Sequence, residues 1–447
     1  MYETVKVDLN RQVGRIKPMH AVNNGPVFKF AADQRITNID YFREAGIPYA
    51  RTHDASISYG YGGEHTVDIT AVFPDFNADP YDPASYDFTL TDEYMQVIKY
   101  AGVEPFFRLG QKIEHWKKKY GILPPADFKK WAIVCEHIIK HFNYGWADGY
   151  EMNIKYWEIW NEPDLDPDDS DNKRTWGGTK AQFFELYHIT ATYLKEKFPE
   201  LKIGGPALSG NMVWAEEFLA QLKAPLDFFS WHRYKADPKL MADRMRETRA
   251  LLDKYGFTEA ESILNEWNYV TGWFDDEWIY SLKAEKGLKG ASFTAAVMCE
   301  GQKAPLDMLM YYDARPCGMN GLFNTDFICE PLKGYYPFKA FGELYRLGTE
   351  VYTESEGDMR ICAARNGDNA AIMVNRFTVD TKNPADNKKV KIEIKGSADI
   401  LAEFYLLDET HDLELVREEI FGGETVRTVL DFAPDGLYLI KLRKAEL

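Results

Sequence analysis

The sequence of 447 residues is longer than most single domains and long enough for a large barrel with a smaller module beside it. Hydrophobic residues make up 45% of the chain, which supports a substantial core, and the 15% of aromatic residues suits either sugar stacking or aromatic core packing. A formal net charge of −17 without a basic run argues against nucleic acid and anionic membranes as partners and disfavours a polyanionic substrate.

Strand-like segments alternate with amphipathic helical segments from residue 13 to residue 348. Eight such β/α units match an α/β fold of the (β/α)8 TIM-barrel type. No GxGxxG or GxxxxGK[ST] motif occurs in the sequence, which disfavours an open nucleotide-binding sheet. We expect the strands at 17–22, 49–53, 104–109, 156–160, 202–205, 226–232, 262–266 and 306–312.

The helical period is clear in the segments 33–46 and 179–200. The first ends at Gly46, because a glycine commonly follows the last helical residue, and the second stops at Pro199. The pattern predicts a long helix in each segment.

From residue 349 the chain changes to short alternating runs separated by Asn, Asp and Gly turns. This pattern is typical of a β-sandwich and carries no helical period. The opening segment alternates in the same way. We therefore predict a catalytic barrel over 13–348 and a β-sandwich over 349–447, with the N-terminal strand 1–12 joining the sandwich.

Cysteine usage and the N-terminal segment bear on the compartment. The cysteines are odd in number and lack CxxC or CxH spacing, which indicates free thiols in a reducing environment. The opening segment MYETVKVDLN is polar, and no apolar stretch reaches membrane-spanning length. We expect a cytoplasmic protein, unless a signal segment has been removed. The five cysteines are Cys135, Cys299, Cys317, Cys329 and Cys362.

Two glutamates end strands on opposite sides of the predicted barrel. In YWEIWNEPDL, Glu162 follows the strand 156–160, and Pro163 prevents the strand from continuing. Glu266 ends the seventh strand in LNEWN. Two such carboxylates about 5–5.5 Å apart can cleave a glycoside with retention, because one protonates the leaving oxygen and the other attacks the anomeric carbon.

The surroundings of the two glutamates predict different roles. A general acid must keep its proton near neutral pH, which burial favours, and Trp157 and Trp160 are expected to surround Glu162. A nucleophile must stay ionised, and Arg51 can supply positive charge to Glu266 while Tyr234 supplies a hydrogen bond.

Other residues at the strand ends are candidates for sugar binding. The Asn161 amide is expected to bind the sugar 2-hydroxyl. His53 and His232 also end strands, although each could instead be a core histidine. Trp273 and Trp278 follow the seventh strand and are candidates for stacking on a sugar ring.

The motif WEIWNEPD, followed about a hundred residues later by LNEWN, resembles the clan A retaining glycosidases. With ARTHD on the second strand and KGYYPFKAFGELYRLG at 333–348, it resembles glycoside hydrolase family 39, the β-xylosidase and α-L-iduronidase family. The resemblance covers nearly the whole chain and implies acid/base Glu162 and nucleophile Glu266. It also implies sugar contacts from His53, Asn161, His232 and Tyr234. Asn265 and Asp164 depart from the residues common at their positions, which leaves the exact activity open.

The substrate expected from the sequence is a neutral glycoside. An α-L-iduronidase would need cations such as Arg174 or Arg315 to clamp a uronate carboxylate, but the charge of −17 favours a neutral sugar. We expect a β-xyloside from plant oligosaccharides, ahead of a β-glucoside, β-galactoside or arabinoside.

Two other classes of protein remain as alternatives. A metal-dependent barrel hydrolase would need paired histidines on the first strand, which offers only His20. We therefore expect neither a metal nor a cofactor. A non-catalytic carbohydrate-binding barrel is disfavoured because Glu162 and Glu266 are both present.

Overall fold

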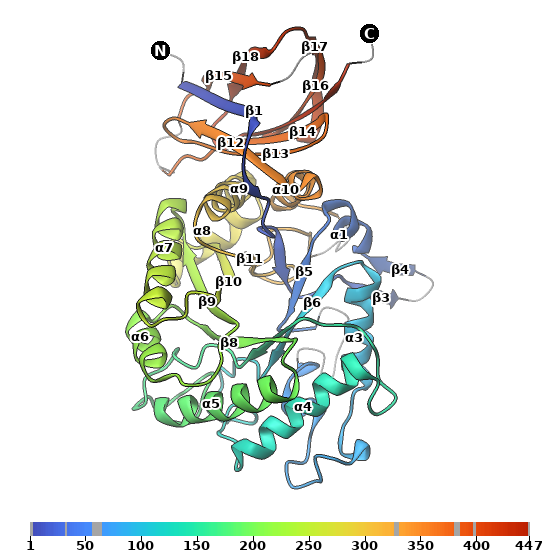
Figure 1. Cartoon of the computed structure of the whole chain (residues 1–447), viewed down its shortest axis with the longest axis vertical. Helices are drawn as coiled ribbons and strands as arrows, with labels where there is room; N and C mark the ends of the chain where they lie inside the picture. Colours follow the sequence, from blue (N-terminus) through green and yellow to red (C-terminus); the bar gives the residue numbers. More distant parts are fainter. Residues whose placement is uncertain are drawn as a thin grey trace.

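The computed structural model describes residues 3–31, 34–55, 65–325, 330–379, 385–396 and 399–445. Eight parallel strands in these residues close into a barrel (Figure 1). The predicted TIM barrel is confirmed, because each of the eight expected strands has an observed counterpart. Around the barrel the strands are β2 (Ala21–Asn23), β5 (Tyr49–Thr52), β6 (Glu104–Leu109), β7 (Tyr156–Ile159), β8 (Lys202–Leu208), β9 (Phe228–Lys235), β10 (Glu261–Tyr269) and β11 (Met308–Tyr311).

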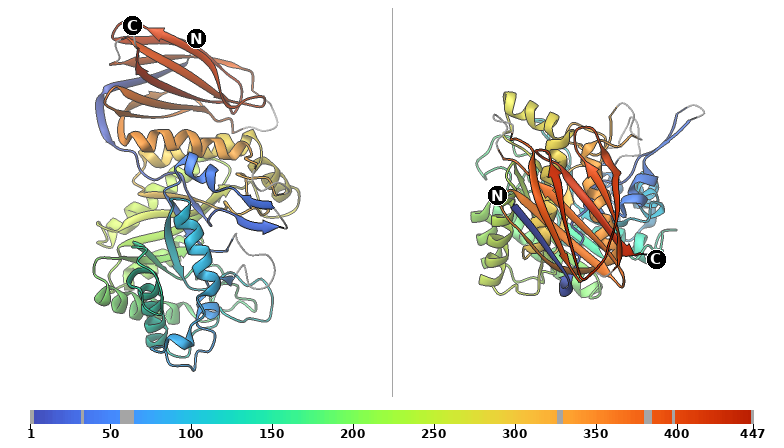
Figure 2. Two further views of the ribbon diagram at one scale, coloured as in Figure 1. Left: turned by 90° about the vertical axis from the view of Figure 1, so that its right-hand side faces the viewer. Right: turned by 90° about the horizontal axis from the view of Figure 1, so that it is seen from above.

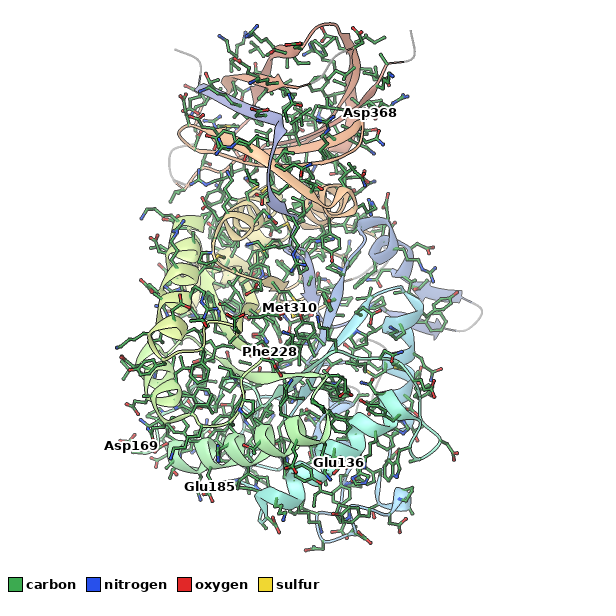
Figure 3. All side chains as sticks on the ribbon, in the orientation of Figure 1. Glu136, Asp169, Glu185, Phe228, Met310 and Asp368 are labelled. Atoms are coloured by element: carbon green, nitrogen blue, oxygen red, sulfur yellow. The ribbon has the colours of Figure 1, made fainter. Side chains whose placement is uncertain are left out.

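The barrel strands bury side chains on both faces. Phe106, Tyr156, Phe228 and Met310 pack with one another in the barrel interior, where Figure 3 labels Phe228 and Met310. Residues that alternate with these face the surrounding helices, so the strands appear in the sequence as nearly continuous apolar runs. The helices are α1 (Ile39–Ala45), α2 (Ile69–Val72), α3 (Thr89–Tyr100), α4 (Phe128–Tyr144), α5 (Lys180–Lys197), α6 (Met212–Gln221), α7 (Pro238–Lys254), α8 (Asp275–Glu285), α9 (Leu288–Lys303) and α10 (Tyr336–Leu347).

Helix α5 lies within the predicted segment 179–200 and ends before Pro199, with Thr179 forming a capping box at its N-terminus. Helix α1 ends at the predicted Gly46, whose φ of 62° is left-handed. However, the prediction of one helix over 33–46 is wrong in its first half. The segment Gln34–Thr37 forms strand β4, which pairs with β3 (Phe28–Ala31) as a hairpin, because local pairing overrides the helical pattern there.

The remaining strands form a mixed nine-stranded sheet that curls over a core of its own (Figure 2). Strand β1 (Glu3–Arg15) lies inside this sheet, between β12 and β15, and continues beyond residue 12. Along β15 and β18, buried side chains alternate with more exposed ones, and this accounts for the alternating apolar and polar residues in the sequence. The other strands are β12 (Thr349–Ser355), β13 (Met359–Asn366), β14 (Asn369–Arg376), β15 (Lys388–Lys395), β16 (Ile400–Leu407), β17 (Asp412–Phe421), β18 (Thr425–Phe432) and β19 (Leu437–Lys444).

Helices α9 and α10 lie between the barrel and the sheet (Figure 1). Ser292 on α9 exchanges hydrogen bonds with Asn375 on β14, and Lys289 forms an ion pair with Asp435 at 2.6 Å. These contacts fix the sheet against helix α9 on the flank of the barrel (Figure 1).

The cysteines and the helices of the described residues bear on two expectations from the sequence. Cys135, Cys299, Cys317 and Cys362 are free thiols, as expected, and Cys329 lies outside the described residues. Among the helices described, none has both the length and the apolar character required to span a membrane.

Candidate active site

Glu162 follows β7 where the chain turns sharply out of the barrel. Trp160 and Glu162 have positive φ angles of 74° and 47°, a left-handed conformation that is strained for residues other than glycine. The backbone N–H of Glu162 donates to the Ala207 carbonyl at the end of β8, at 2.8 Å. This bond helps to hold the strained turn and so fixes the direction of the Glu162 side chain.

Glu162 and Glu266 both approach the same nitrogen of one imidazole ring. His232 Nδ1, on β9, lies 2.7 Å from Glu162 Oε1 and 3.3 Å from Glu266 Oε2. These three atoms all lie within 4.8 Å of one another. Burial lowers the pKa of His232 to about 4, so the ring is neutral at neutral pH.

The Glu162 carboxyl holds a proton near neutral pH. Burial raises its pKa from 4.5 to about 7, although the nearby His53 and Arg51 act in the opposite direction. A carboxyl with this pKa can act as an acid in one step and as a base in the next.

The two tryptophans expected around Glu162 pack elsewhere. Trp157 contacts Phe107 with ring centroids 5.0 Å apart, and Trp160 contacts Trp176 at 5.1 Å. Both lie in the layer between the strands and the helices. The prediction that they surround the carboxyl is therefore wrong, because the alternation of the strand directs Trp157 away from the barrel interior.

Glu266 is surrounded by hydrogen-bond donors. Arg51 Nη1 lies 2.9 Å from Glu266 Oε1, and the Tyr234 hydroxyl donates to Oε2 at 2.8 Å. His53 Nε2 is 3.7 Å from Oε1. The structure thus brings the predicted positive charge and hydrogen bond to this carboxylate, and both stabilise its ionised form.

Arg51 is fully buried and connects several residues of the site. Its Nε donates to Glu158 Oε2 at 2.6 Å, and its Nη2 donates to Asn161 Oδ1 at 2.7 Å. With its oxygen bound to Arg51, the Asn161 amide keeps its N–H₂ group for donation. The Asn265 side chain donates to Glu158 Oε1 at 2.5 Å.

Glu158 was not identified from the sequence, although a signal was present. It is a charged residue in the middle of an apolar strand, and it shares the face of Tyr156, which packs in the barrel interior. A fully buried carboxylate on that face requires a cationic partner.

The other residues considered from the sequence lie at three different places around the barrel. Trp273, in the loop after β10, is 48% exposed and contacts the Tyr234 ring. Trp278 stacks on Trp273 with ring centroids 5.2 Å apart. His20 precedes β2, at the opposite end of the barrel from the glutamates, and its Nε2 lies 2.9 Å from the Gly46 carbonyl oxygen. Asp164 accepts hydrogen bonds from the loop after β8, including Ser209 N at 2.7 Å.

The two arginines considered as uronate clamps are already paired with carboxylates. Arg174 contacts both oxygens of Asp166, at 2.7 and 3.1 Å. Arg315 contacts Asp54 at 3.2 Å and Asp313 at 3.4 Å. Their positive charges are thus compensated within the protein.

Glu162, His232 and Glu266 also form the kind of donor set that holds a divalent cation. Two carboxylates and one neutral imidazole suit zinc, and the 4.8 Å limit on their separations suits a single ion. A cation there would engage both glutamates at once. Since Arg51 and Tyr234 already satisfy Glu266, the site does not require a metal.

Paired carboxyls at the carboxyl ends of strands in a closed parallel barrel, one protonated near pH 7 and one beside an arginine, define a glycoside hydrolase site. The family model described as "Glycosyl hydrolases family 39" matches residues 4–302. The chain belongs to glycosyl hydrolase family 39, and the resemblance inferred from the sequence motifs is confirmed.

Characterised relatives are similar to the chain at modest identity. A β-xylosidase of Caldicellulosiruptor saccharolyticus is 24% identical over 342 residues, covering 70% of this chain and 68% of the relative. A β-xylosidase of Geobacillus stearothermophilus is 27% identical over 218 residues, which span only 41% of each protein.

Solved structures reproduce the whole fold. A glucosidase from Croceicoccus marinus superposes with a TM-score of 0.80 at 22% identity, covering 100% of this chain and 99% of the other. A monomeric β-xylosidase from Caulobacter crescentus CB15 gives a TM-score of 0.72 at 18% identity, covering 99% and 100%. These likenesses support the barrel-and-sheet architecture.

Proposed function

We propose that this family 39 glycoside hydrolase is a retaining β-xylosidase-like enzyme acting on oligosaccharides of plant origin. The observation that supports this proposal is the proximity of the two carboxyls: one oxygen of Glu162 and one of Glu266 lie no more than 4.8 Å apart. Retaining glycosidases hold their carboxyls about 5–5.5 Å apart, whereas inverting enzymes leave about 6.5–9.5 Å for a water molecule.

Two displacements at the anomeric carbon account for hydrolysis. The ionised Glu266 attacks the anomeric carbon, the bond to the leaving oxygen breaks, and the Glu162 proton moves to that oxygen. Water then attacks the same carbon, Glu162 takes a proton from it, and the bond to Glu266 breaks. Each displacement inverts the centre, so the product keeps the configuration of the substrate.

The surrounding residues have defined parts in this scheme. Arg51 and Tyr234 stabilise the Glu266 carboxylate before attack and again when it departs. Asn161 donates to the 2-hydroxyl of the sugar, and His53 contacts the hydroxyls on the same side. His232, held neutral by burial, orients Glu162 through its Nδ1 atom.

Two observations bear on the choice of sugar. The compensated charges of Arg174 and Arg315 favour a neutral glycoside over a uronide. Two relatives carry the name β-xylosidase, which puts a β-xyloside ahead of a β-glucoside, β-galactoside or arabinoside.

A panel of 4-nitrophenyl glycosides tests both the sugar and the activity. We expect the highest kcat/KM on the β-D-xyloside. Proton NMR of the first-formed sugar then tests the mechanism, and the β-anomer should appear before mutarotation. Appearance of the α-anomer would refute the double displacement, and hydrolysis of none of the panel would favour the non-catalytic binding protein.

A further inference from the structure

An aromatic platform stands beside the proposed nucleophile. Trp273 in the loop after β10 is 48% exposed, and Trp278 on α8 stacks on it with an interplanar angle of 28°. The Tyr234 ring meets Trp273 edge-on, with centroids 5.1 Å apart. Because Tyr234 also donates to Glu266 at 2.8 Å, only one ring separates the exposed Trp273 from the reacting carboxylate.

The order of the strands distinguishes two sides of the site. In one direction from β7 to β10 the barrel passes through β8 and β9, and in the other through β6, β5, β2 and β11. Arg51 lies on β5 and His53 follows that strand, so these two polar side chains lie on the second side. Tyr234 of β9 lies on the first side, and Trp273 contacts it there.

The anomeric carbon must sit between Glu162 and Glu266, so the two parts of the substrate extend to opposite sides of that pair. The side with His53 and Arg51 offers polar groups for the hydroxyls of the sugar that becomes attached to the enzyme. The side with Trp273 offers a flat apolar face, and the polar atoms that β9 presents there, on His232 and Tyr234, already contact the two glutamates. This division suits a leaving group that binds briefly and departs.

We propose that Trp273, supported by Trp278, forms a leaving-group subsite that stacks the pyranose ring released in the first step. The inference rests on the proposed glycosidase function and adds that the natural substrate is at least a disaccharide. A sugar fits better than an aromatic aglycone because three exposed carboxylates lie between Trp273 and Trp278 in the chain and can accept hydrogen bonds from hydroxyls. They are Asp275, Asp276 and Glu277.

The test compares substrates that differ only in the leaving group. Trp273→Ala and Trp273→Phe are assayed on the β-linked disaccharide of the preferred sugar and on its glycosyl fluoride, whose leaving group has no ring. We expect Trp273→Ala to lower kcat/KM on the disaccharide by about tenfold and on the fluoride by less than about twofold. Trp273→Phe should recover part of the loss, because it keeps a flat face.

A matched control is Trp116→Ala, since Trp116 is 80% exposed in the loop after β6, on the other side of the site. It should leave both substrates unchanged. A loss on the disaccharide with Trp116→Ala but not with Trp273→Ala would put the leaving group on the opposite side and overturn the proposal. Equal losses on both substrates with Trp273→Ala would also overturn it.

Two further measurements separate this inference from the proposed function. If 4-nitrophenyl glycosides lose as much as the disaccharide while the fluoride is unaffected, the platform serves any flat ring and the sugar assignment is wrong. In a Glu266→Gln background, calorimetry should give about tenfold weaker disaccharide binding with Trp273→Ala and unchanged monosaccharide binding. This readout needs no turnover, so unchanged disaccharide binding would overturn the subsite even if the wild type proved inactive.

Discussion

Arg51 and Glu158 form a fully buried ion pair in the barrel, with 2.6 Å between Arg51 Nε and Glu158 Oε2. The same guanidinium contacts Glu266 and Asn161, so Glu158 holds the arginine that positions two residues of the site. Removing one partner of a buried pair is costly because the other charge loses its compensation.

We therefore predict that Glu158→Ala lowers the stability of the fold by about 3–5 kcal/mol and strongly lowers kcat/KM. Urea unfolding followed by circular dichroism measures the first effect. Glu158→Gln is the matched control, because it keeps hydrogen-bonding capacity without the charge, and it should retain more activity than Glu158→Ala. Wild-type stability in Glu158→Ala would contradict the structural role.

Azide rescue distinguishes the two glutamates. In Glu162→Ala an activated aryl glycoside still forms the glycosyl-enzyme, but its hydrolysis stalls because no base activates water. Azide needs no base and should yield a glycosyl azide of retained configuration. In Glu266→Ala azide can attack only from the vacated face and should give the inverted product. The opposite pattern of products would reverse the assignment.

The pH dependence of kcat/KM should follow the raised pKa of Glu162. Its acid form is required for the first step, so activity on poor leaving groups should fall as the pH rises through about 7. For a substrate such as a dinitrophenyl glycoside, whose leaving group needs no proton, this decrease should vanish from kcat/KM. A decrease that persists with such a substrate would assign that titration to a different group.

Glu285 at the end of α8 should make stability depend on pH. It is 1% exposed, and neither carboxylate oxygen has a hydrogen-bond partner among the described residues. Burial raises its pKa from 4.5 to about 9, so the folded protein holds a proton that the unfolded chain releases. The free energy of unfolding therefore falls as the pH rises from 4.5 towards 9, by up to about 1.4 kcal/mol per pH unit. Below pH 4.5 the carboxyl is protonated in both states, and the stability that the protonated Glu285 contributes is fully present.

Glu285→Gln removes this titration and keeps nearly the same shape. We expect the variant to be more stable than the wild type at pH 8, with a smaller difference at pH 5, as measured by thermal unfolding at the two pH values. An equal difference at both values would mean that Glu285 does not titrate in this range.

Metal ions should be dispensable but inhibitory. EDTA is expected to leave activity intact, since nothing in the reaction scheme uses a metal. Added Zn²⁺ should inhibit competitively with substrate, because Glu162, His232 and Glu266 can hold a cation only when both glutamates are withdrawn from catalysis. Mg²⁺, which prefers oxygen ligands in an octahedron, is the control and should have little effect. A loss of activity in EDTA that zinc restores would favour the metal-dependent hydrolase.

The periodic and local features of this protein could be predicted from its sequence. Eight apolar runs between amphipathic helices predicted the barrel, because a strand buried on both faces must be apolar throughout. Glu162 before Pro163 and Glu266 at a strand end were identifiable because the strand ends of a barrel meet at one side. The end of a helix at Gly46 was likewise readable from neighbouring residues.

The way in which side chains from distant strands come together depends on the tertiary structure. It directed Trp157 away from Glu162, put His232 between the two glutamates, and joined Glu158 to Arg51 across 107 residues of chain. It also formed β4 where the local pattern predicted helix. Such relationships depend on strand register and on which face each residue presents, and a shift of one residue reverses every face. The reacting residues can therefore be identified from short stretches of sequence. Their protonation states and contacts depend on burial, which arises only when the barrel closes.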